Sequence, residues 1–409
     1  MNQPVLQDFS YDPFDPDVMA DPLPYYRTLR DRHPVYYIGK WDTYALSRFD
    51  DIWQVLGVND GTFVASEGTL PAANVLEHHN DGPVTDPPLH PMPFHANFDS
   101  PIYENVRRCT SAQFRPRSAT KLTDRIRALA NERLDELLPR GRFDLTQDYG
   151  GIVAATMACE FVGLPDDLAP EVLAIVNAGT LAEPGEGVEV GNARPGFLSY
   201  LTPIVERRRA EGADGSVPIA DSLIGFRLPD GSAFDDVEAA TQMLGVFIGA
   251  TETVPKVTAT GLWELSQRPD QLAAVRADLD ANVPVAREEI IRYCAPAQWF
   301  ARTVRWPYTI HDTTLEPGQR VITLLASAAR DEREYDDPDA FIWNRPIERL
   351  LSFGHGQHFC LGVHVARQEI TIMMQEFLKR VPDYRIVADG ASRPPSSFQW
   401  GWNSIPVEV

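Results

Sequence analysis

A single segment, residues 235–267, constrains the fold of this chain more than any other part of the sequence. Its residues favour helix from end to end, and at 1.5 Å per residue they would form a helix about 50 Å long. That is several times the usual helix length, so the helix must cross the whole molecule. Midway, the sequence GATETVP (residues 249–255) has a glycine, two threonines and an internal proline. These residues predict a local distortion there, with backbone carbonyls left free.

Shorter patterns set the fold class. Apolar spacing predicts further helices at 22–32, 118–138, 150–163, 270–278, 284–293 and 361–380. Aromatic and β-branched runs predict short strands at 35–49, 303–311 and 319–326, and a hairpin at 396–409. Residues 66–101 are rich in Pro, His, Asn and Asp and predict a long lid-like loop, and 185–196 predicts a second loop. The chain is therefore expected to be mainly α with small β-sheets, and a doubly wound sheet is not expected.

Charge and cysteine usage narrow the class of protein. The chain has 37 basic and 58 acidic residues, and its formal net charge of −21 argues against nucleic acid or an anionic membrane as partner. Its four cysteines, Cys109, Cys159, Cys294 and Cys360, form no CxxC pair, so neither a disulfide framework nor a zinc finger is expected. The first residues carry no leader pattern, and no apolar run reaches about 20 residues. We expect a cytoplasmic protein without membrane attachment.

The sequence LLSFGHGQHFCLGVHVARQEI, residues 350–370, points most sharply to chemistry. Three glycines, Gly354, Gly356 and Gly362, surround Cys360, and a predicted helix follows at once. The positive end of a helix and nearby amide donors stabilise a thiolate. Glycines let the backbone approach a large, flat group, because no Cβ intervenes. A thiolate held against a flat cofactor is the arrangement found in haem-thiolate proteins.

The pattern Phe-Gly-x-Gly-x-His-x-Cys-x-Gly, from Phe353 to Gly362, resembles the signature of the cytochrome P-450 family. The resemblance covers nearly the whole chain. It implies one domain, 1–409, with a β-rich N-terminal part at about 1–65, the variable loop at about 66–101 and a helical haem-binding core at about 102–409. The implied fold is a triangular helical prism whose long central helix lies over the haem. The implied cofactor is haem b with Cys360 as axial iron ligand, and Phe353, Gly354 and Gly362 lie against it.

The implied activity is monooxygenation with O2 as co-substrate. Residues 249–253 resemble the family's oxygen-activation motif on the central helix, with Gly249 and Ala250 beside the haem. Ala250 stands where the family usually has glycine, so its methyl group is expected to narrow the oxygen site. Glu252 and Thr253 carry over as the acid and the hydroxyl that deliver protons.

A second family motif is structural. Glu289 and Arg292 match the Glu-x-x-Arg pattern, and at this spacing the two charges share one helix face. Arg345 lies where the family's third partner belongs. The resemblance implies a triad that braces the segment before the cysteine.

Haem propionates need cationic or hydrogen-bonding partners. The resemblance implies His358, two residues before the cysteine, and Arg302, ten residues after Arg292. It also implies Tyr103 and Arg107, where the family often has His-x-x-x-Arg, so that Tyr103 replaces the histidine.

Two histidines in the long loop remain open. His90 follows a familiar Asp-Pro-Pro-x-His start, but Phe94 stands where an arginine is usual. Whether His90 or His95 contacts the haem or is an ordinary loop residue is left open.

The resemblance places the substrate pocket among mostly apolar residues, namely Phe247, Ile248, Ala297, Gln298, Trp299, Phe300, Phe398 and Gln399. Aromatic walls of this kind suit a small aromatic or terpenoid-like substrate, although the tryptophans also fit an ordinary core.

A separate ferredoxin-type or flavoprotein electron donor is implied as partner. A cluster of basic residues would attract an acidic donor, or would be a solvated helix face: Arg107, Arg108, Arg115, Arg117 and Lys121.

Two other classes stay open. A peroxide-driven or isomerising haem-thiolate enzyme would not need the acid–threonine pair, and a haem-based sensor would be expected to carry an effector domain.

Overall fold

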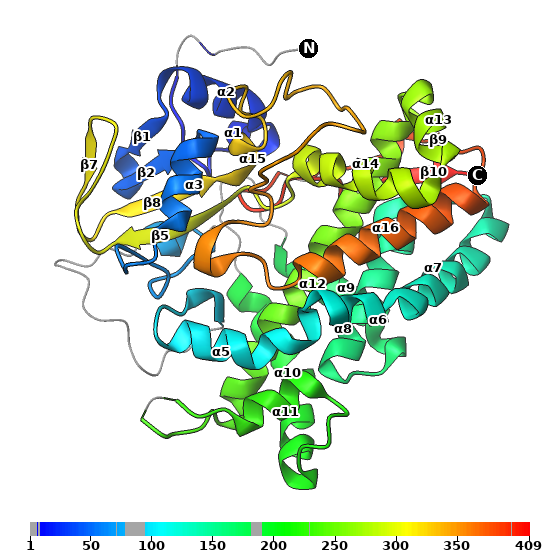
Figure 1. Cartoon of the computed structure of the whole chain (residues 1–409), viewed down its shortest axis with the longest axis horizontal. Coiled ribbons are helices and arrows are strands. Elements are labelled where there is room, and N and C mark those ends of the chain that lie inside the picture. The colour runs from blue at the N-terminus through cyan, green and yellow to red at the C-terminus, as the bar shows by residue number, and fades with distance from the viewer. Residues whose placement is uncertain are drawn as a thin grey trace.

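Sheet and helices occupy different parts of the molecule (Figure 1). The structure is a computed structural model and describes residues 6, 9–70, 72–77, 95–180, 190–228, 230–393 and 395–409. The main sheet lies at one edge beside the first helices, and the remaining helices form the larger part (Figure 1). The described residues are therefore mainly helical with small sheets, as the sequence predicts.

The helices within the described residues are α1 (Pro16–Ala20), α2 (Leu23–Arg32), α3 (Phe49–Gly57), α4 (Ala73–Glu77), α5 (Ile102–Thr110), α6 (Pro116–Lys121), α7 (Thr123–Leu137), α8 (Ile152–Val162), α9 (Ala169–Thr180), α10 (Val190–Glu211), α11 (Pro218–Gly225), α12 (Asp236–Ser266), α13 (Pro269–Ala277), α14 (Leu279–Cys294), α15 (Leu325–Ala328) and α16 (Val363–Arg380). The strands are β1 (Val35–Ile38), β2 (Thr43–Leu46), β3 (Phe63–Val64), β4 (Arg142–Asp144), β5 (Trp299–Val304), β6 (Tyr308–Ile310), β7 (Thr313–Leu315), β8 (Arg320–Leu324), β9 (Arg385–Ile386) and β10 (Pro406–Glu408).

The largest sheet joins distant parts of the chain, in the order β1-β2-β8-β5-β3. Strand β2 runs parallel to β8, with Thr43 opposite Arg320. Strand β5 is antiparallel to β8, with Trp299 opposite Leu324. The strands predicted at 35–49 and 319–326 are confirmed, and β5 lies between β8 and β3 in the sheet.

Helix α12 is the predicted long helix. Asp235 caps its N-terminus and forms a capping box with Glu238. The helix has 31 residues and is mostly buried, and it contacts α8, α10, α14 and α16. It continues without a break through 249–255, where we expected a distortion. The hydroxyls of Thr251 and Thr253 donate hydrogen bonds to Phe247 O and Gly249 O within this stretch.

Two further sequence expectations concern helices and need correction. The helix predicted at 118–138 is divided, because the Leu122 N–H bonds to Ala119 O and closes α6 before α7 begins. The loop predicted at 185–196 is helical from Val190, because α10 packs against α9 and α12, and packing outweighs the poor helix propensity of Gly and Pro. Residues 181–189 lie outside the described part of the chain.

The C-terminal segment does not form the predicted hairpin. Its strand β10 pairs with β4 and β9, and Gln399 forms an isolated bridge with Ala297. The buried side chains of Ile405 and Val407 belong to the helical core, which explains why this strand pairs away from its own neighbours. The bridge at Gln399 brings this part of the C-terminal segment to the central cavity.

Candidate active site

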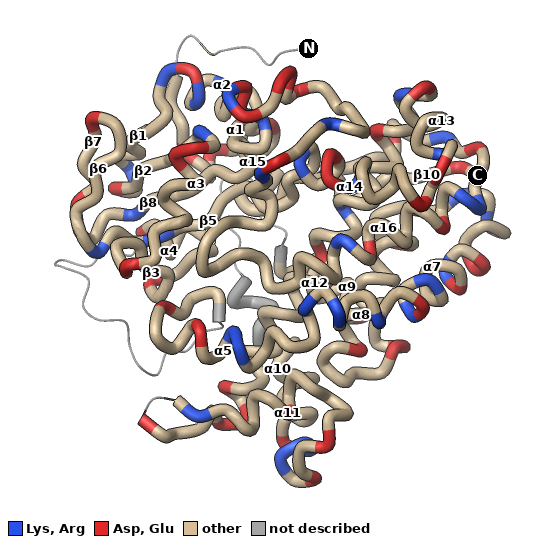
Figure 2. The backbone as a smooth tube through the Cα atoms, viewed as in Figure 1, with Lys and Arg blue, Asp and Glu red and all other residues tan. Residues whose placement is uncertain are grey.

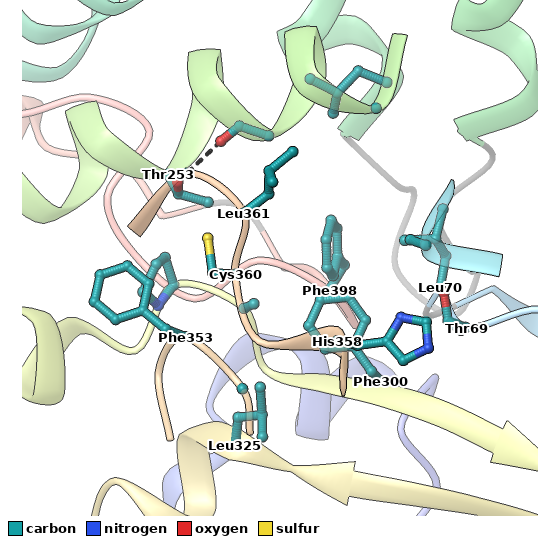
Figure 3. A pocket seen from close by; sticks show the side chains of 18 of the residues that line it. Thr69, Leu70, Thr253, Phe300, Leu325, Phe353, His358, Cys360, Leu361 and Phe398 are labelled. Atoms are coloured by element: carbon teal, nitrogen blue, oxygen red, sulfur yellow. Dashed lines mark hydrogen bonds between the residues drawn. The ribbon is translucent and has the colours of Figure 1, made fainter. Parts of the chain in front are cut away.

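A cavity of about 1340 Å³ lies between the Cys360 segment and helix α12. It is lined from α12, from β5, from the segment before α4 and from residues 352–370. The Cys360 sulfur points into it, toward the part of α12 that carries Thr253 (Figure 3). The sequence motifs that implied a cofactor site therefore meet at one cavity.

Backbone geometry holds the segment before Cys360 in a tight turn. Gly354 and Gly356 have φ values of +72° and +68°, which other residues rarely adopt. A Cβ at Gly356 would lie 2.0 Å from Leu56 O, so only glycine fits there. The Cys360 N–H donates to Phe353 O at 2.8 Å, and α16 begins three residues later. Both glycines that the sequence singled out on this side thus serve the turn.

Cys360 differs from the other cysteines in its surroundings. Of the four cysteines it alone lines the cavity. Burial raises the pKa of its thiol, while the amides of Gly362 and Val363 and the guanidinium groups of Arg107 and Arg367 act in the opposite direction. The expected stabilisation of a thiolate by these groups is present, but in the protein alone burial outweighs it. A bound metal ion deprotonates a ligating thiol outright.

Arg107 and Tyr103 on α5 hold the backbone of the cysteine segment. Arg107 donates from Nη2 to Phe359 O at 2.6 Å and from Nη1 to Tyr103 Oη at 2.8 Å. Tyr103 in turn donates to Gln357 O at 2.6 Å. The ring of His358 lies 4.1 Å from that of Tyr103. Tyr103, Arg107 and His358 all line the cavity, so the three residues implied by the resemblance come together.

Arg302 on β5 is a buried cation with no carboxylate paired to it among the described residues. Its side chain lines the cavity, and its one hydrogen bond to described residues goes to Ala301 O at 2.7 Å. Burial lowers the pKa of its guanidinium to about 10, against a smaller contribution from Asp99. A buried cation without a paired carboxylate is costly unless an anion binds beside it. The donor set at this end of the cavity therefore fits an acidic group.

Two glycines at the cavity have open space beside their backbone. Gly249 on α12 and Gly362 before α16 both line it, and a Cβ at either would meet no atom within 4 Å. A planar group can therefore approach the backbone at both positions. The adjacent Ala250 also lines the cavity, and that its methyl group narrows the oxygen site stays a prediction.

The α12 wall carries the acid and the hydroxyl. Thr253 and Glu252 line the cavity, and the Thr253 hydroxyl donates to Gly249 O at 3.3 Å (Figure 3). Glu252 Oε1 accepts from Lys256 Nζ at 2.5 Å, and Oε2 accepts from Gln399 Nε2 at 3.1 Å. The sequence reasoning missed Lys256, although its position one helical turn after Glu252 was a signal for the pair.

The predicted triad is present and buried. Arg292 donates to Glu289 through Nε at 2.6 Å and Nη2 at 2.8 Å, and Arg345 Nε donates to Glu289 Oε2 at 3.1 Å. The two arginines also donate to carbonyls within residues 329–340. The triad therefore holds the segment that leads to the cysteine turn.

The predicted pocket residues divide by the face on which they lie. Five line the cavity: Ile248, Ala297, Phe300, Phe398 and Gln399. Phe247, Gln298 and Trp299 do not, which corrects the prediction. Phe247 packs against Phe197, and Gln298 bonds with Tyr26 and Ser396.

Trp299 shows the physical reason on the sheet. Successive residues of a strand face opposite sides, so Phe300 and Arg302 reach the cavity while Trp299 packs on Phe14. The structure adds wall residues that the sequence analysis did not name, including Thr69, Leu70, Thr241, Leu244 and Leu325. Thr69 and Leu70 lie in the predicted long loop, which was the available signal. His90 lies outside the described residues, and only the backbone of His95 is described.

Comparison with known proteins agrees with this geometry. The sequence profile of the family described as Cytochrome P450 matches residues 188–397. The protein named putative cytochrome P450 123 of Mycobacterium tuberculosis is 30% identical over 97% of this chain and 96% of its own length. The chain belongs to the cytochrome P450 family. A further relative, CYP199A2 of Rhodopseudomonas palustris, is 28% identical over 97% of this chain and 93% of its own length.

The fold comparison extends the same result. The structure of cytochrome P450 CYP109Q5 from Chondromyces apiculatus matches with a TM-score of 0.80 and 26% identity, over 97% of each chain. The protein is thus a cytochrome P450 monooxygenase, a class that uses a haem-thiolate cofactor, a substrate and an electron donor. Within the described residues, no helix combines the length and apolar character that crossing a membrane requires.

Proposed function

We propose that Cys360 is the iron ligand of this P450, and that the cavity holds haem b between Cys360 and α12. The observation that carries the proposal is that Cys360 alone of four cysteines lines the cavity. The open backbone at Gly249 and Gly362 leaves room for a planar cofactor. When bound, haem with a thiolate ligand supplies the chemistry that cleaves O2 and transfers one oxygen atom to a substrate.

Arg302 and His358 bind the haem propionates in this proposal, with Phe353 and Gly354 against the cofactor. The buried guanidinium of Arg302 has no carboxylate within ion-pair distance among the described residues, so a propionate would supply the missing charge. Arg107 and Tyr103 act mainly by holding the cysteine turn, because their polar groups already bond to Phe359 O and Gln357 O.

Thr253 and Glu252 handle protons on the α12 side. The hydroxyl of Thr253 makes only a long hydrogen bond of 3.3 Å to Gly249 O, so it can turn toward the cavity at small cost. The Glu252 carboxylate lies one residue before it and also faces the cavity. The hydroxyl can then donate a proton into the cavity and be resupplied from the acid.

The substrate is a small, mostly apolar molecule of aromatic or terpenoid type. Apolar side chains from several elements face the cavity, among them Ile248, Phe300, Leu325 and Phe398. The rings of Phe300 and Phe398 meet edge to face with their centroids 6.0 Å apart. Together they offer an aromatic surface against which a substrate can pack. Such walls bind by apolar burial and offer few polar groups for recognition.

A spin-state titration tests the substrate class. Indole, naphthalene, limonene and camphor are added to the ferric holoenzyme, and the Soret band is followed. We expect a shift toward high spin with at least one of them and a weaker shift in Phe398→Ala. No shift with any member, together with a shift for a long-chain fatty acid, would contradict the proposed class.

The electron donor is an acidic ferredoxin in this proposal. Arg108, Arg115, Arg117 and Lys121 are exposed on and beside α5 and α6, where Figure 2 shows basic positions along α5. Arg107 is not part of this surface, because its guanidinium is bonded to the cysteine turn. Opposite charge steers encounter between such partners. The cytoplasmic location stays a prediction from composition.

A further inference from the structure

Lys256 is a buried lysine next to the proposed acid. It lies on α12, with its side chain 4% exposed, and the side chain of Glu252 is 3% exposed. Their charged atoms, Nζ and Oε1, are 2.5 Å apart. Among the described residues Glu252 is the only carboxylate within ion-pair distance of Lys256. The pair is thus isolated from solvent, where its charges depend on each other.

Each oxygen of the Glu252 carboxylate accepts a hydrogen bond from a different donor. Lys256 bonds to one oxygen and Gln399 to the other, so the side chain is fixed from both sides. The two donors come from different parts of the chain, since Gln399 belongs to the C-terminal segment bridged to Ala297. A carboxylate held in this way has one orientation, and both Glu252 and the next residue, Thr253, line the cavity.

Gly401 leaves space for the aliphatic part of the Lys256 side chain. Gly401 has φ +146°, and a Cβ there would lie 3.3 Å from Lys256 Cβ and 3.6 Å from Cys294 Sγ. Burial raises the pKa of the neighbouring Cys294 thiol, and the hydrogen bond from Thr260 and the charges of Arg393, Lys256 and Arg330 act in the opposite direction. Arg330 and Arg393 have acidic groups of their own nearby, Asp339 for Arg330 and Glu264 for both, so Glu252 is the anion that balances Lys256.

We propose that Lys256 is a positioning residue for the oxygenation reaction: it keeps the Glu252 carboxylate charged and oriented next to Thr253. The physical reason is that a buried carboxylate without a counter-charge becomes protonated instead of staying ionised. The ionised carboxylate can take up a proton from water that reaches the cavity and release it to the Thr253 hydroxyl as that hydroxyl gives up its own. Without the ammonium group the neutral form of the carboxyl is favoured, so Glu252 would keep its proton, lose its fixed orientation and pass protons to Thr253 less readily. This inference rests on the proton-handling role proposed above for Glu252.

The first test needs no substrate. Infrared difference spectra of the ferric holoenzyme at pH 7 compare wild type, Lys256→Met and the double variant Lys256→Met/Glu252→Gln. We expect an added band of a protonated carboxyl in Lys256→Met, absent from the other two. Glu369, whose pKa burial raises to about 8, contributes equally to all three proteins and cancels in the differences. Absence of the band in Lys256→Met would overturn the proposal.

The second test measures coupling, the fraction of NADH electrons found in product, with the compound from the panel that gives the largest spin shift. We expect Lys256→Met to lower coupling about threefold or more, as much as Glu252→Gln does, and the double variant to be no worse. Lys256→Arg keeps the charge and should retain most coupling. Equal losses in Lys256→Arg and Lys256→Met would show that shape and not charge matters, and would overturn the proposal.

The two proposals fail in different ways. Normal coupling in Lys256→Met together with loss in Glu252→Gln would overturn the role of Lys256 and support the acid. Normal coupling in Glu252→Gln would overturn the acid role itself. If Lys256→Met does not accumulate as folded protein, Lys256→Gln takes its place, because its amide donates hydrogen bonds but carries no charge. The carbon-monoxide spectrum of each variant shows that the haem site is intact.

Discussion

The two walls of the cavity are built in different ways. The cysteine wall is held through the backbone: the Cys360 N–H bonds to Phe353 O, and Arg107 bonds to Phe359 O. The α12 wall is held through side chains, and Glu252 depends on Lys256 and on Gln399, which is distant in sequence. The cysteine wall is therefore fixed by hydrogen bonds to its backbone, while the arrangement of the α12 wall depends on a few polar and charged side chains.

This difference predicts two kinds of failure. Damage to the supports of the cysteine wall should lower stability and haem retention. Damage on the α12 wall should lower coupling while the haem spectrum stays normal. The following predictions are ordered from the largest expected effect to the smallest.

Breaking the triad gives the largest effect. Glu289→Ala leaves Arg292 and Arg345 buried without their carboxylate, and we expect a loss of roughly 3–5 kcal/mol in unfolding free energy. Guanidinium unfolding of the holoenzyme, followed by haem absorbance, measures it. The control is Glu288→Ala on the same helix, whose ion pair with Arg367 is partly exposed and contributes about 1 kcal/mol. Equal midpoints for the two variants would contradict the bracing role.

Glu369 makes the cysteine wall sensitive to pH. It lies on α16 at the cavity, its Oε1 has no hydrogen-bond partner among the described residues, and burial raises its pKa from 4.5 to about 8. The folded protein therefore holds this proton more tightly than the unfolded chain, and stability falls as pH rises from about 4.5 to 8. Glu369→Gln should remove part of this decline, by on the order of 2 kcal/mol at pH 8. Thermal unfolding at pH 5 and pH 8 measures it, and parallel curves for both proteins would contradict the assignment.

Two threonines on α12 offer a matched pair for the other wall. Both hydroxyls donate to the carbonyl four residues earlier, but only Thr253 lines the cavity. Thr253→Val should lower coupling about threefold or more, because the hydroxyl that passes protons is lost, while Thr251→Val keeps it. Product and hydrogen peroxide per NADH are measured for both. A Thr253→Val protein that couples like Thr251→Val would show that another group relays protons.

Changing a charge on the basic surface proposed to bind the electron donor should have the smallest effect, measured as the rate of haem reduction. Arg108→Glu reverses an exposed charge on α5 and should slow reduction by an acidic [2Fe–2S] ferredoxin about two- to fivefold at low salt. Arg140→Glu makes the same charge change beyond the C-terminal end of α7 and serves as control. Stopped-flow reduction under carbon monoxide measures both. Equal rates would place the donor elsewhere, and substrate-induced spin shifts should be the same in both variants.

Local spacing explains what could be predicted from the sequence. The cysteine turn, the triad and the long helix are each defined by residues close together in the chain or by one helix face. The failures involve tertiary geometry. Trp299 and Phe300 are neighbours, and only the strand's position against the cavity decides which one faces it.

The same holds for the remaining differences. Gln399 reaches Glu252 because the C-terminal segment pairs with other strands and not with itself. Phe247 lies on the face of α12 that packs against Phe197, a contact between helices that spacing alone does not reveal. Arg107 was predicted both for the haem and for a basic surface, and the structure places its guanidinium in the cysteine turn.

The central claim is that Cys360 supplies the thiolate, and the reduced, carbon-monoxide-bound spectrum tests it most directly. Wild type should show the red-shifted Soret band of a thiolate-ligated haem. Cys294→Ala, which changes a buried cysteine away from the cavity wall, should keep that band. Cys360→Ala should lose it. A red-shifted band that persists in Cys360→Ala, or that is missing from the haem-loaded wild type, would contradict the account.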